Sequence, residues 1–360
     1  MLTKGDEYPI HQLPEPIAYA GSDPNFYDRY FFNGYSMENE AFFAMALGVY
    51  PHVNIIDASF SVIKDGIQHN LRASRHLGME RMDTKIGPIS LEILEPLKSL
   101  RIVIEKNEHG IEADVTFTAR IEAVEEPRYI RRVGPRMLMD LTRMTQNGSY
   151  SGWIDIKGEK INITPDEWFG TRDRSWGVRL IGSQIATLDV LPQFYWLWAP
   201  ANFEDCCVLY DINQDDEGNT WHTHGVIAPI GVAAPEEMKR PESQVKFKSG
   251  TRHAASAVIR FWNKDEEETQ IHIEPMYQFY MSGLGYAHPE WGHGMNKGEL
   301  ATAYDTIDLG SVDETGLLYL HIQAVSKFQM GDKTGMGVLE QAIIGSHAPS
   351  GFKEFLDVAP

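Results

Sequence analysis

Apolar and polar residues alternate along much of the chain, most clearly between Ile111 and Ala123. Every odd position of this run is apolar, and every even position is polar or charged. A period of two is typical of a β-strand with one face in the core and the other in water. The apolar run 100–104 precedes it and the turn residues 107–110 connect the two, so we predict an antiparallel hairpin.

The same alternation recurs in shorter segments separated by turns rich in Gly, Asn and Asp. We predict further hairpins over 153–163, 206–227 and 255–273, and a strand over 317–322 after the turn 313–316. Helices are scarce. The spacing of Met137, Leu138, Leu141 and Met144 predicts one helix that ends near Asn147-Gly148, and 233–241 is predicted to be a surface connection or one helical turn. Strands at this density indicate an all-β sandwich or barrel.

The length of 360 residues suggests about two domains, because a domain commonly contains ~150 residues. Apolar residues make up 42% of the chain and charged residues 23%, a balance that excludes a disordered or collagen-like polypeptide. No low-complexity segment or long linker separates two halves. We therefore predict two closely packed β domains, 1–179 and 180–360, that meet just after the string Trp176-Gly177-Val178-Arg179.

The formal net charge of -19 narrows the range of partners. A negative field repels phosphates and anionic lipids, so we expect neither nucleic-acid binding nor a polybasic membrane anchor. No run approaches the ~18 apolar residues of a membrane span, and the first sixteen residues contain no apolar leader segment.

The only cysteines, Cys206 and Cys207, are adjacent, and a disulfide between neighbours is strained. We therefore expect reduced thiols and a cytoplasmic location.

The segment 166–179 concentrates unusual residues: two Trp, three Arg, two Gly and three carboxylates. If it is extended, Arg172 and Arg174 face one side and Asp173 faces the other. Guanidinium groups beside a carboxylate keep it ionised, which favours Asp173 as an ion-pair partner or an ionised base rather than a proton donor. Two interpretations remain open, a structural latch between the domains and a wall of a substrate site.

A second unusual segment, 283–294, places Tyr286, His288, Glu290 and His293 among glycines. Titratable groups in a turn-rich segment can approach a ligand closely and move a proton near neutral pH. The alternative is a glycine-rich crossover loop whose His and Trp residues only cap strands.

Three other groups of residues are weaker candidates. His222 and His224 share one strand face, but no third metal ligand is marked by spacing, so we expect exposed hairpin histidines and no metal. In the run 194–198, Tyr195 and Leu197 share one face and Trp196 and Trp198 the other, which suits a core or a ligand cavity. We interpret His69, Arg72 and Arg75 as charged residues of an edge strand.

Nucleotide-binding glycine motifs and a serine-hydrolase elbow are absent from the sequence, which disfavours nucleotide-dependent chemistry and serine hydrolysis.

The strings 170–179 (GTRDRSWGVR) and 286–294 (YAHPEWGHG) resemble those of largely uncharacterised bacterial proteins. This group is related to the AttH-like and carotenoid 1,2-hydratase (hydroxyneurosporene synthase) superfamily. Further similar stretches are 48–51, 87–91 and 150–153, so the resemblance covers nearly the whole chain. It implies two tandem lipocalin-like barrels with a ligand cavity in or between them. It also implies cofactor-free hydration, isomerisation or cyclisation of apolar molecules such as terpenoids and polyketides.

Our expectation is therefore a lyase, hydratase or isomerase for a hydrophobic terpenoid, steroid-like or aromatic molecule, working by acid–base chemistry without a cofactor. The alternative is a non-catalytic carrier of the same ligands, and a homodimer is an open option. The candidate catalytic residues are His293, Tyr286, Asp173 and Arg172. The candidate substrate-binding residues are Trp176, Arg179, Tyr195, Trp198, His288 and Trp291.

Overall fold

The computed structural model describes residues 2–19, 23–37, 41–181, 193–232 and 234–360. These residues form two large antiparallel sheets, and their only helical elements are short 3-10 turns. The turns are η1 (Lys4–Glu7), η2 (Pro51–Val53), η3 (Met281–Leu284), η4 (Leu317–Tyr319) and η5 (Ala348–Ser350). The expected all-β class with few helices is confirmed. None of the helical elements in the described part of the chain has the length and apolar character needed to cross a membrane.

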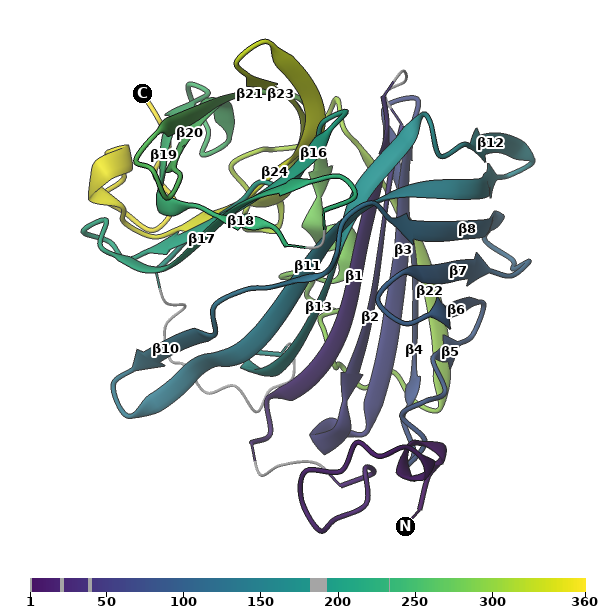
Figure 1. The fold of residues 1–360 in the computed structure, drawn as a ribbon. Coiled ribbons are helices and arrows are strands. Elements are labelled where there is room, and N and C mark those ends of the chain that lie inside the picture. Colours follow the sequence, from purple (N-terminus) through teal and green to yellow (C-terminus); the bar gives the residue numbers. More distant parts are fainter. Residues whose placement is uncertain (1, 20–22, 38–40, 182–192, 233) are drawn as a thin grey trace.

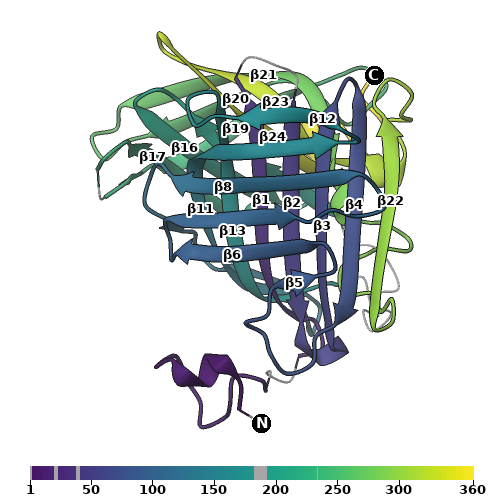
Figure 2. The same cartoon turned by 90° about the vertical axis from the view of Figure 1, so that its right-hand side faces the viewer.

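The first sheet contains fourteen strands in the order β22-β4-β3-β2-β1-β13-β11-β8-β7-β6-β5, with β9, β10 and β12 paired to β11. Its strands are β1 (Phe26–Ser36), β2 (Phe42–Tyr50), β3 (Ile55–Lys64), β4 (Ile67–His76), β5 (Lys85–Ile86), β6 (Ile89–Glu95), β7 (Ser99–Ile104), β8 (Ile111–Ala119), β9 (Val124–Glu125), β10 (Tyr129–Val133), β11 (Arg136–Ile156), β12 (Glu159–Ile163), β13 (Trp168–Arg179) and β22 (Leu300–Asp308). The sheet curls on itself, so that β6 and β8 cross over β1–β4 (Figure 2). Its apolar core lies between these two layers.

The second sheet contains ten strands in the order β18-β17-β16-β14-β24-β23-β21-β20-β19, with β15 paired to β16 and β24. Its strands are β14 (Phe194–Trp198), β15 (Ala201–Asn202), β16 (Cys206–Gln214), β17 (Thr220–Pro229), β18 (Glu236–Glu237), β19 (Lys239–Phe247), β20 (Ala254–Trp262), β21 (Glu268–Tyr280), β23 (His321–Met330) and β24 (Lys333–Ile344). It packs against the β1, β11 and β13 side of the first sheet (Figure 1). A second core lies within it, and a third joins the two sheets.

The hairpins predicted from alternation are present. β7 pairs with β8, β11 with β12, β16 with β17, and β20 with β21. The strand expected to run to Ala123 ends at Ala119. The strand expected over 317–322 begins only at His321, because Leu317–Tyr319 form the turn η4.

The helix predicted from Met137, Leu138, Leu141 and Met144 is wrong. These residues lie in β11, which is hydrogen-bonded to β10 on one side and to β13 on the other. Pairing along both edges outweighs a four-residue apolar spacing that also suits a helix.

The interpretation of His69, Arg72 and Arg75 as edge-strand charges is also wrong. β22 pairs along the whole of β4, so β4 is internal to the sheet. Arg72 is only 2% exposed and forms an ion pair with Asp305 of β22. β22 belongs to the C-terminal half of the sequence yet completes the sheet of the N-terminal half.

Candidate functional site

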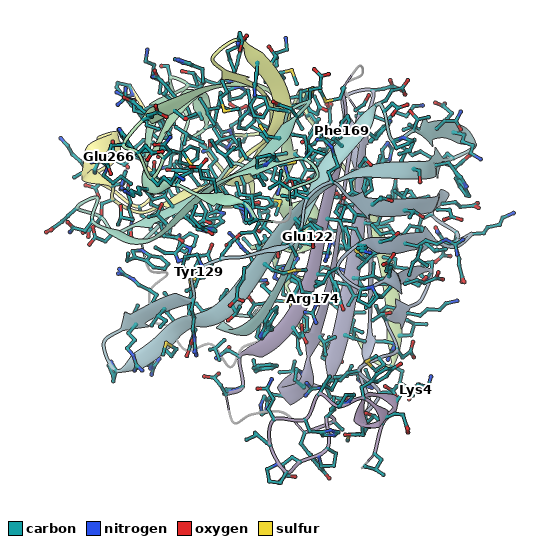
Figure 3. All side chains as sticks on the ribbon, viewed as in Figure 1. Lys4, Glu122, Tyr129, Phe169, Arg174 and Glu266 are labelled. Carbon is teal, nitrogen blue, oxygen red and sulfur yellow. The ribbon has the colours of Figure 1, made fainter. Side chains whose placement is uncertain are left out.

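A cavity of about 330 Å³ lies between the two sheets. The first sheet contributes residues of β1, β10, β11 and β13, and the second contributes residues of β14, β16, β23 and β24. Tyr129 of β10 lies where the second sheet approaches the first (Figure 3). Aromatic and aliphatic side chains make up most of the walls, and a few charged groups interrupt them. An apolar cavity with few polar groups is the usual form of a small-molecule site.

Strand register positions the wall made by the first sheet. Side chains alternate along β13, so Asp173, Ser175 and Arg179 line the cavity, and the even-numbered residues face the other way. Phe31 and Arg29 of β1 lie beside Asp173 and Ser175 in register. Because these strands pair without shifts along this stretch, all of these side chains emerge on one face.

Gly177 lies between Ser175 and Arg179 on the same face of β13. Its φ of +137° lies in a region that residues with a Cβ rarely adopt. A Cβ at this position would lie 2.3 Å from the Asp140 carbonyl oxygen of β11. Glycine therefore keeps β13 close to β11 beneath the cavity wall.

Side chains also alternate between two faces along β14, which forms part of the opposite wall. Phe194, Trp196 and Trp198 of β14 face the cavity, while Tyr195 and Leu197 face the core of the second sheet. The predicted division of this aromatic run between two faces is therefore correct.

Asp173 is the carboxyl group of β13 in this cavity. Burial raises its pKa from 3.8 to about 6, an effect that Glu126 and Glu340 reinforce and Arg143 and Arg29 oppose. No hydrogen bond to its carboxylate is found among the described residues. The expectation that arginines hold this group ionised is wrong in direction, because desolvation outweighs their attraction.

Glu340 and His321 form a hydrogen-bonded pair on the opposite wall. Glu340 accepts hydrogen bonds from His321 Nε2 at 2.8 Å, Gln323 Nε2 at 2.6 Å and Trp196 Nε1 at 3.1 Å. Burial alone would raise the pKa of Glu340, but the hydrogen bonds from these three donors help to lower that pKa. Because an ionised carboxylate only accepts, we assign the proton on the His321 ring to Nε2, which leaves Nδ1 as the acceptor.

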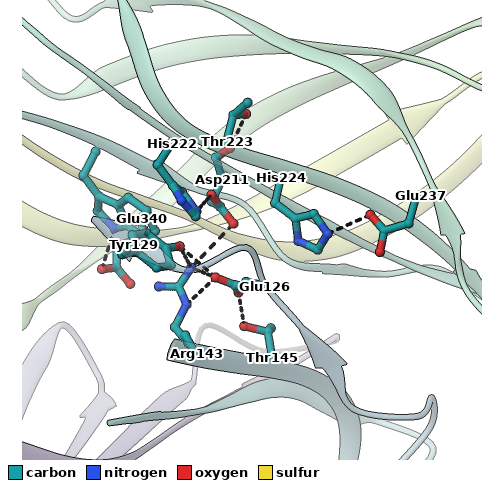
Figure 4. A network of polar contacts seen from close by, with 11 residues as sticks. Glu126, Tyr129, Arg143, Thr145, Asp211, His222, Thr223, His224, Glu237 and Glu340 are labelled. Atoms are coloured by element: carbon teal, nitrogen blue, oxygen red, sulfur yellow. Dashed lines mark hydrogen bonds and ion pairs between the residues drawn. The ribbon is translucent and has the colours of Figure 1, made fainter. Parts of the chain in front are cut away.

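A buried network supports Arg143 at one end of the cavity (Figure 4). Arg143 donates from Nε to Glu126 at 2.6 Å and from Nη2 to the Tyr129 hydroxyl at 2.6 Å, and Nη2 lies 3.6 Å from Asp211. His222 Nε2 lies 2.9 Å from Asp211, and its ring stacks on Tyr129 with centroids 3.5 Å apart. The network fixes the guanidinium against the Trp196 ring at 4.8 Å.

The prediction of exposed hairpin histidines is wrong. His222 and His224 are 6% and 7% exposed, and they bind different carboxylates, since His224 Nε2 lies 2.8 Å from Glu237. The ligand atoms of Glu126, Asp211 and His222 lie within 4.8 Å of one another, a donor set that suits a divalent cation. Arg143 already supplies a positive charge beside both carboxylates, which disfavours a metal ion there.

His293 lies behind the cavity wall. Its Nδ1 accepts a hydrogen bond from Arg29 Nη1 at 3.1 Å, and its Nε2 donates to the Leu284 carbonyl at 3.0 Å. Burial lowers the pKa of His293 well below its usual value, and Arg29 and Arg179 lower it further. A neutral imidazole with both nitrogens engaged holds Arg29 in position and has no free site for proton transfer.

Four of the predicted site residues line the cavity: Tyr286, Asp173, Arg179 and Trp198. The Tyr286 ring packs edge-on against His293 and His321, with centroids 4.5 Å apart in both cases. Trp198 packs edge-on against Phe31 across the two sheets at 6.2 Å.

The other predicted residues lie outside this cavity. Arg172 is buried inside the first sheet, where Nε donates to Gln146 at 2.8 Å, and Trp176 is 40% exposed on the same face of β13. Tyr195 stacks on His347 at 4.0 Å. His288 Nδ1 accepts hydrogen bonds from the backbone N–H groups of Glu290 and Trp291. Trp291 lines a separate cavity of about 10 Å³.

The sequence pattern did not single out Arg29, Arg143, His321 or Glu340, which all line the cavity. One signal was available for Glu340, because it is the only charged residue between Gly337 and Ile344. A lone charge in an apolar strand indicates a buried, paired group.

The fold has solved counterparts. A crystal structure described as a "putative AttH (NE1406)" from Nitrosomonas europaea aligns with a TM-score of 0.56 and 13% identity, over 93% of this chain and 98% of that chain. A crystal structure of CghA aligns with a TM-score of 0.47 and 10% identity, over 89% of this chain and 88% of that chain. A structure of CghA with Sch210972 aligns with a TM-score of 0.45 and 10% identity, over 89% of each chain. At these identities the likeness concerns the fold.

No curated protein matches the sequence. A family model described as "Family of unknown function (DUF8625)" matches residues 2–353. The chain therefore belongs to this family of unknown function, and its fold is that of the AttH-like structure, as the sequence resemblance implied.

Proposed function

We propose that the protein is a cofactor-independent enzyme of the lyase, hydratase or isomerase type. It acts by acid–base chemistry on a hydrophobic small molecule bound between the two sheets. The observation that carries this proposal is the contrast between Asp173 and Glu340. Both carboxyl groups line one apolar cavity, and their surroundings move their pKa values in opposite directions. Carboxyl groups separated in this way are typical of an acid and a base working on one substrate.

The roles follow from the hydrogen bonds. Asp173 has a pKa of about 6 and no described hydrogen-bond partner, so its protonated form can give a proton to a bound molecule. His321 Nδ1 accepts a proton from the substrate or from a water molecule, and the ionised Glu340 stabilises the imidazolium that forms. Regeneration requires that one proton return from His321 to Asp173 through substrate, product or water, so each turnover leaves the protein unchanged.

The aromatic walls supply binding and exclude water. Trp196 and Trp198 present apolar surface, and Arg143 lies over both rings at 4.8 and 5.6 Å. A low-dielectric cavity strengthens the interactions of each charged group with the developing charges of a reaction. Terpenoid, steroid-like and aromatic molecules suit these walls.

Turnover in isotopically labelled water tests the proposal. The protein is incubated with terpenoid, steroid and aromatic compounds in H₂¹⁸O and in D₂O, and products are identified by mass. We expect ¹⁸O or deuterium in a product, and a loss of at least 100-fold in rate for both Asp173→Asn and His321→Asn. His224→Asn is the matched control, because His224 also pairs with a carboxylate but lies outside the cavity.

Two results would count against catalysis. If the wild-type protein binds these compounds without converting any, the carrier alternative replaces the enzyme. If a product forms equally fast with Asp173→Asn, Asp173 is not the proton donor.

A further inference from the structure

Arg179 has an unused hydrogen-bonding edge. Its Nε and Nη2 atoms are buried and have no hydrogen-bond partner among the described residues, although the side chain lines the cavity. Buried charged donors normally have partners, because leaving them unpaired costs free energy that folding does not otherwise recover.

The same edge binds carboxylates elsewhere in this chain. Arg101 donates from Nε to Asp114 Oδ1 at 2.8 Å and from Nη2 to Oδ2 at 2.7 Å. These two N–H groups are parallel and match the spacing of two carboxylate oxygens. Arg179 presents the same pair of donors without an acceptor.

The rings of Tyr27 and Tyr286 pack against the Arg179 guanidinium, and Tyr286 also forms a side-chain hydrogen bond with it, while Nε and Nη2 have no described partner. Its Cζ atom lies 4.5 Å from the centre of the Tyr27 ring and 5.7 Å from that of Tyr286. Arg29 lies on the same Tyr286 ring at 4.8 Å. Two guanidinium groups therefore flank one tyrosine at this part of the cavity.

The local acid does not neutralise both cations. Asp57 accepts a hydrogen bond from the Gly294 backbone at 2.7 Å, and burial raises its pKa to about 6 against the attraction of Arg29 and Arg179. The cavity lining contains three arginines, Arg29, Arg143 and Arg179, against the two carboxyl groups Asp173 and Glu340, so positive groups outnumber negative ones there in a protein whose net charge is -19. An anion bound here is attracted by these arginines.

We infer that Arg179 is an anion-binding subsite that receives the carboxylate of a hydrophobic acid. This inference rests on the proposed function only in using the same cavity, and it names the substrate class. The apolar body of the acid lies against Trp196 and Trp198, and its carboxylate takes both donors of Arg179. Tyr286 separates Arg179 from His321, so the reacting atom lies about one aromatic ring away from the carboxylate.

Binding of two matched probes tests this subsite. 2-Naphthoate and 2-naphthamide have nearly the same shape and differ in charge, and isothermal titration calorimetry measures the affinity of the protein for each. We expect the wild-type protein to bind 2-naphthoate at least 10-fold more tightly than the amide. Arg179→Met should weaken 2-naphthoate binding at least 10-fold and change amide binding less than twofold.

Two further variants keep the test decisive. Arg81→Met is the matched control, because Arg81 Nε and Nη2 also lack partners but the residue does not line this cavity, so both affinities should stay unchanged. Arg179→Lys retains the charge and loses the paired donors, so it should weaken 2-naphthoate binding by an intermediate factor. It replaces Arg179→Met in the test if that variant does not fold.

The outcomes separate the subsite from the cavity. Equal wild-type affinity for the two probes, or unchanged 2-naphthoate affinity in the Arg179 variants, overturns the subsite while the proposed cavity stands. Failure of the wild-type protein to bind either probe overturns both.

Discussion

Asp173 and Glu340 differ in the hydrogen bonds that each receives. Glu340 accepts three, from His321, Gln323 and Trp196, and these donors more than offset the cost of burying its charge. Asp173 receives none from the described residues, so burial dominates and its pKa rises to about 6. The difference in hydrogen bonding therefore separates the pKa values of the two carboxyl groups.

The raised pKa of Asp173 predicts a specific dependence of stability on pH. Below about pH 4 the carboxyl group is protonated in the folded and unfolded states alike, and burial has no ionic cost. As pH rises through 6 the folded protein must ionise a buried group, so this stability is lost. Asp173→Asn should therefore raise the free energy of unfolding above pH 6, by about 1–3 kcal/mol at ~1.4 kcal/mol per pKa unit, and have little effect at pH 4.

Urea unfolding of both proteins between pH 4 and pH 8 measures this difference. Asp114→Asn should show the opposite sign, because the pKa of Asp114 is lowered by its hydrogen bonds to Arg101 and its stabilisation is present at neutral pH. An Asp173→Asn curve parallel to that of the wild-type protein would show that Asp173 has an ordinary pKa.

A single strand, β13, separates two interiors. Its even-numbered residues, such as Arg172, face the core of the first sheet, and its odd-numbered residues, such as Asp173, face the cavity between the sheets. The alternation itself was predictable from the sequence, and so were four hairpins, β7–β8, β11–β12, β16–β17 and β20–β21. Which face meets a ligand was not, because protein covers both faces of β13 along most of its length. Four cavity residues of other strands, including Arg29 and Glu340, come together only through long-range packing.

β22 connects the two halves of the chain, because this C-terminal strand pairs with β4 of the N-terminal half. Asp305 of β22 accepts from Asn70 at 2.8 Å and forms an ion pair with the buried Arg72. Asp305→Ala leaves a buried guanidinium without its carboxylate, so we expect a loss of about 2 kcal/mol in unfolding free energy, less than for a fully buried pair because Asp305 is 45% exposed.

Urea unfolding at pH 7 measures the effect of Asp305→Ala. Thr306→Ala is the matched control on the same strand, because Thr306 is exposed, and it should change stability by less than about 0.5 kcal/mol. Equal stability of the Asp305 variant and the control would mean that β22 does not depend on this ion pair.

Over the whole molecule, the two sheets share a core as well as the cavity. Phe42 of the first sheet packs against Phe279 of the second with ring centroids 4.8 Å apart. The division of the chain at 179/180 remains a prediction, and β22 is a C-terminal strand that belongs to the N-terminal sheet. Two sheets fixed against each other in this way give the cavity between them a defined shape, as a binding site requires.

A crystal structure with 2-naphthamide tests most directly whether the cavity is the site. The account predicts that the probe lies between the sheets, stacked among Trp196 and Trp198 and in contact with Asp173. A cavity filled by its own side chains, with the probe bound only on the outer surface, would contradict it.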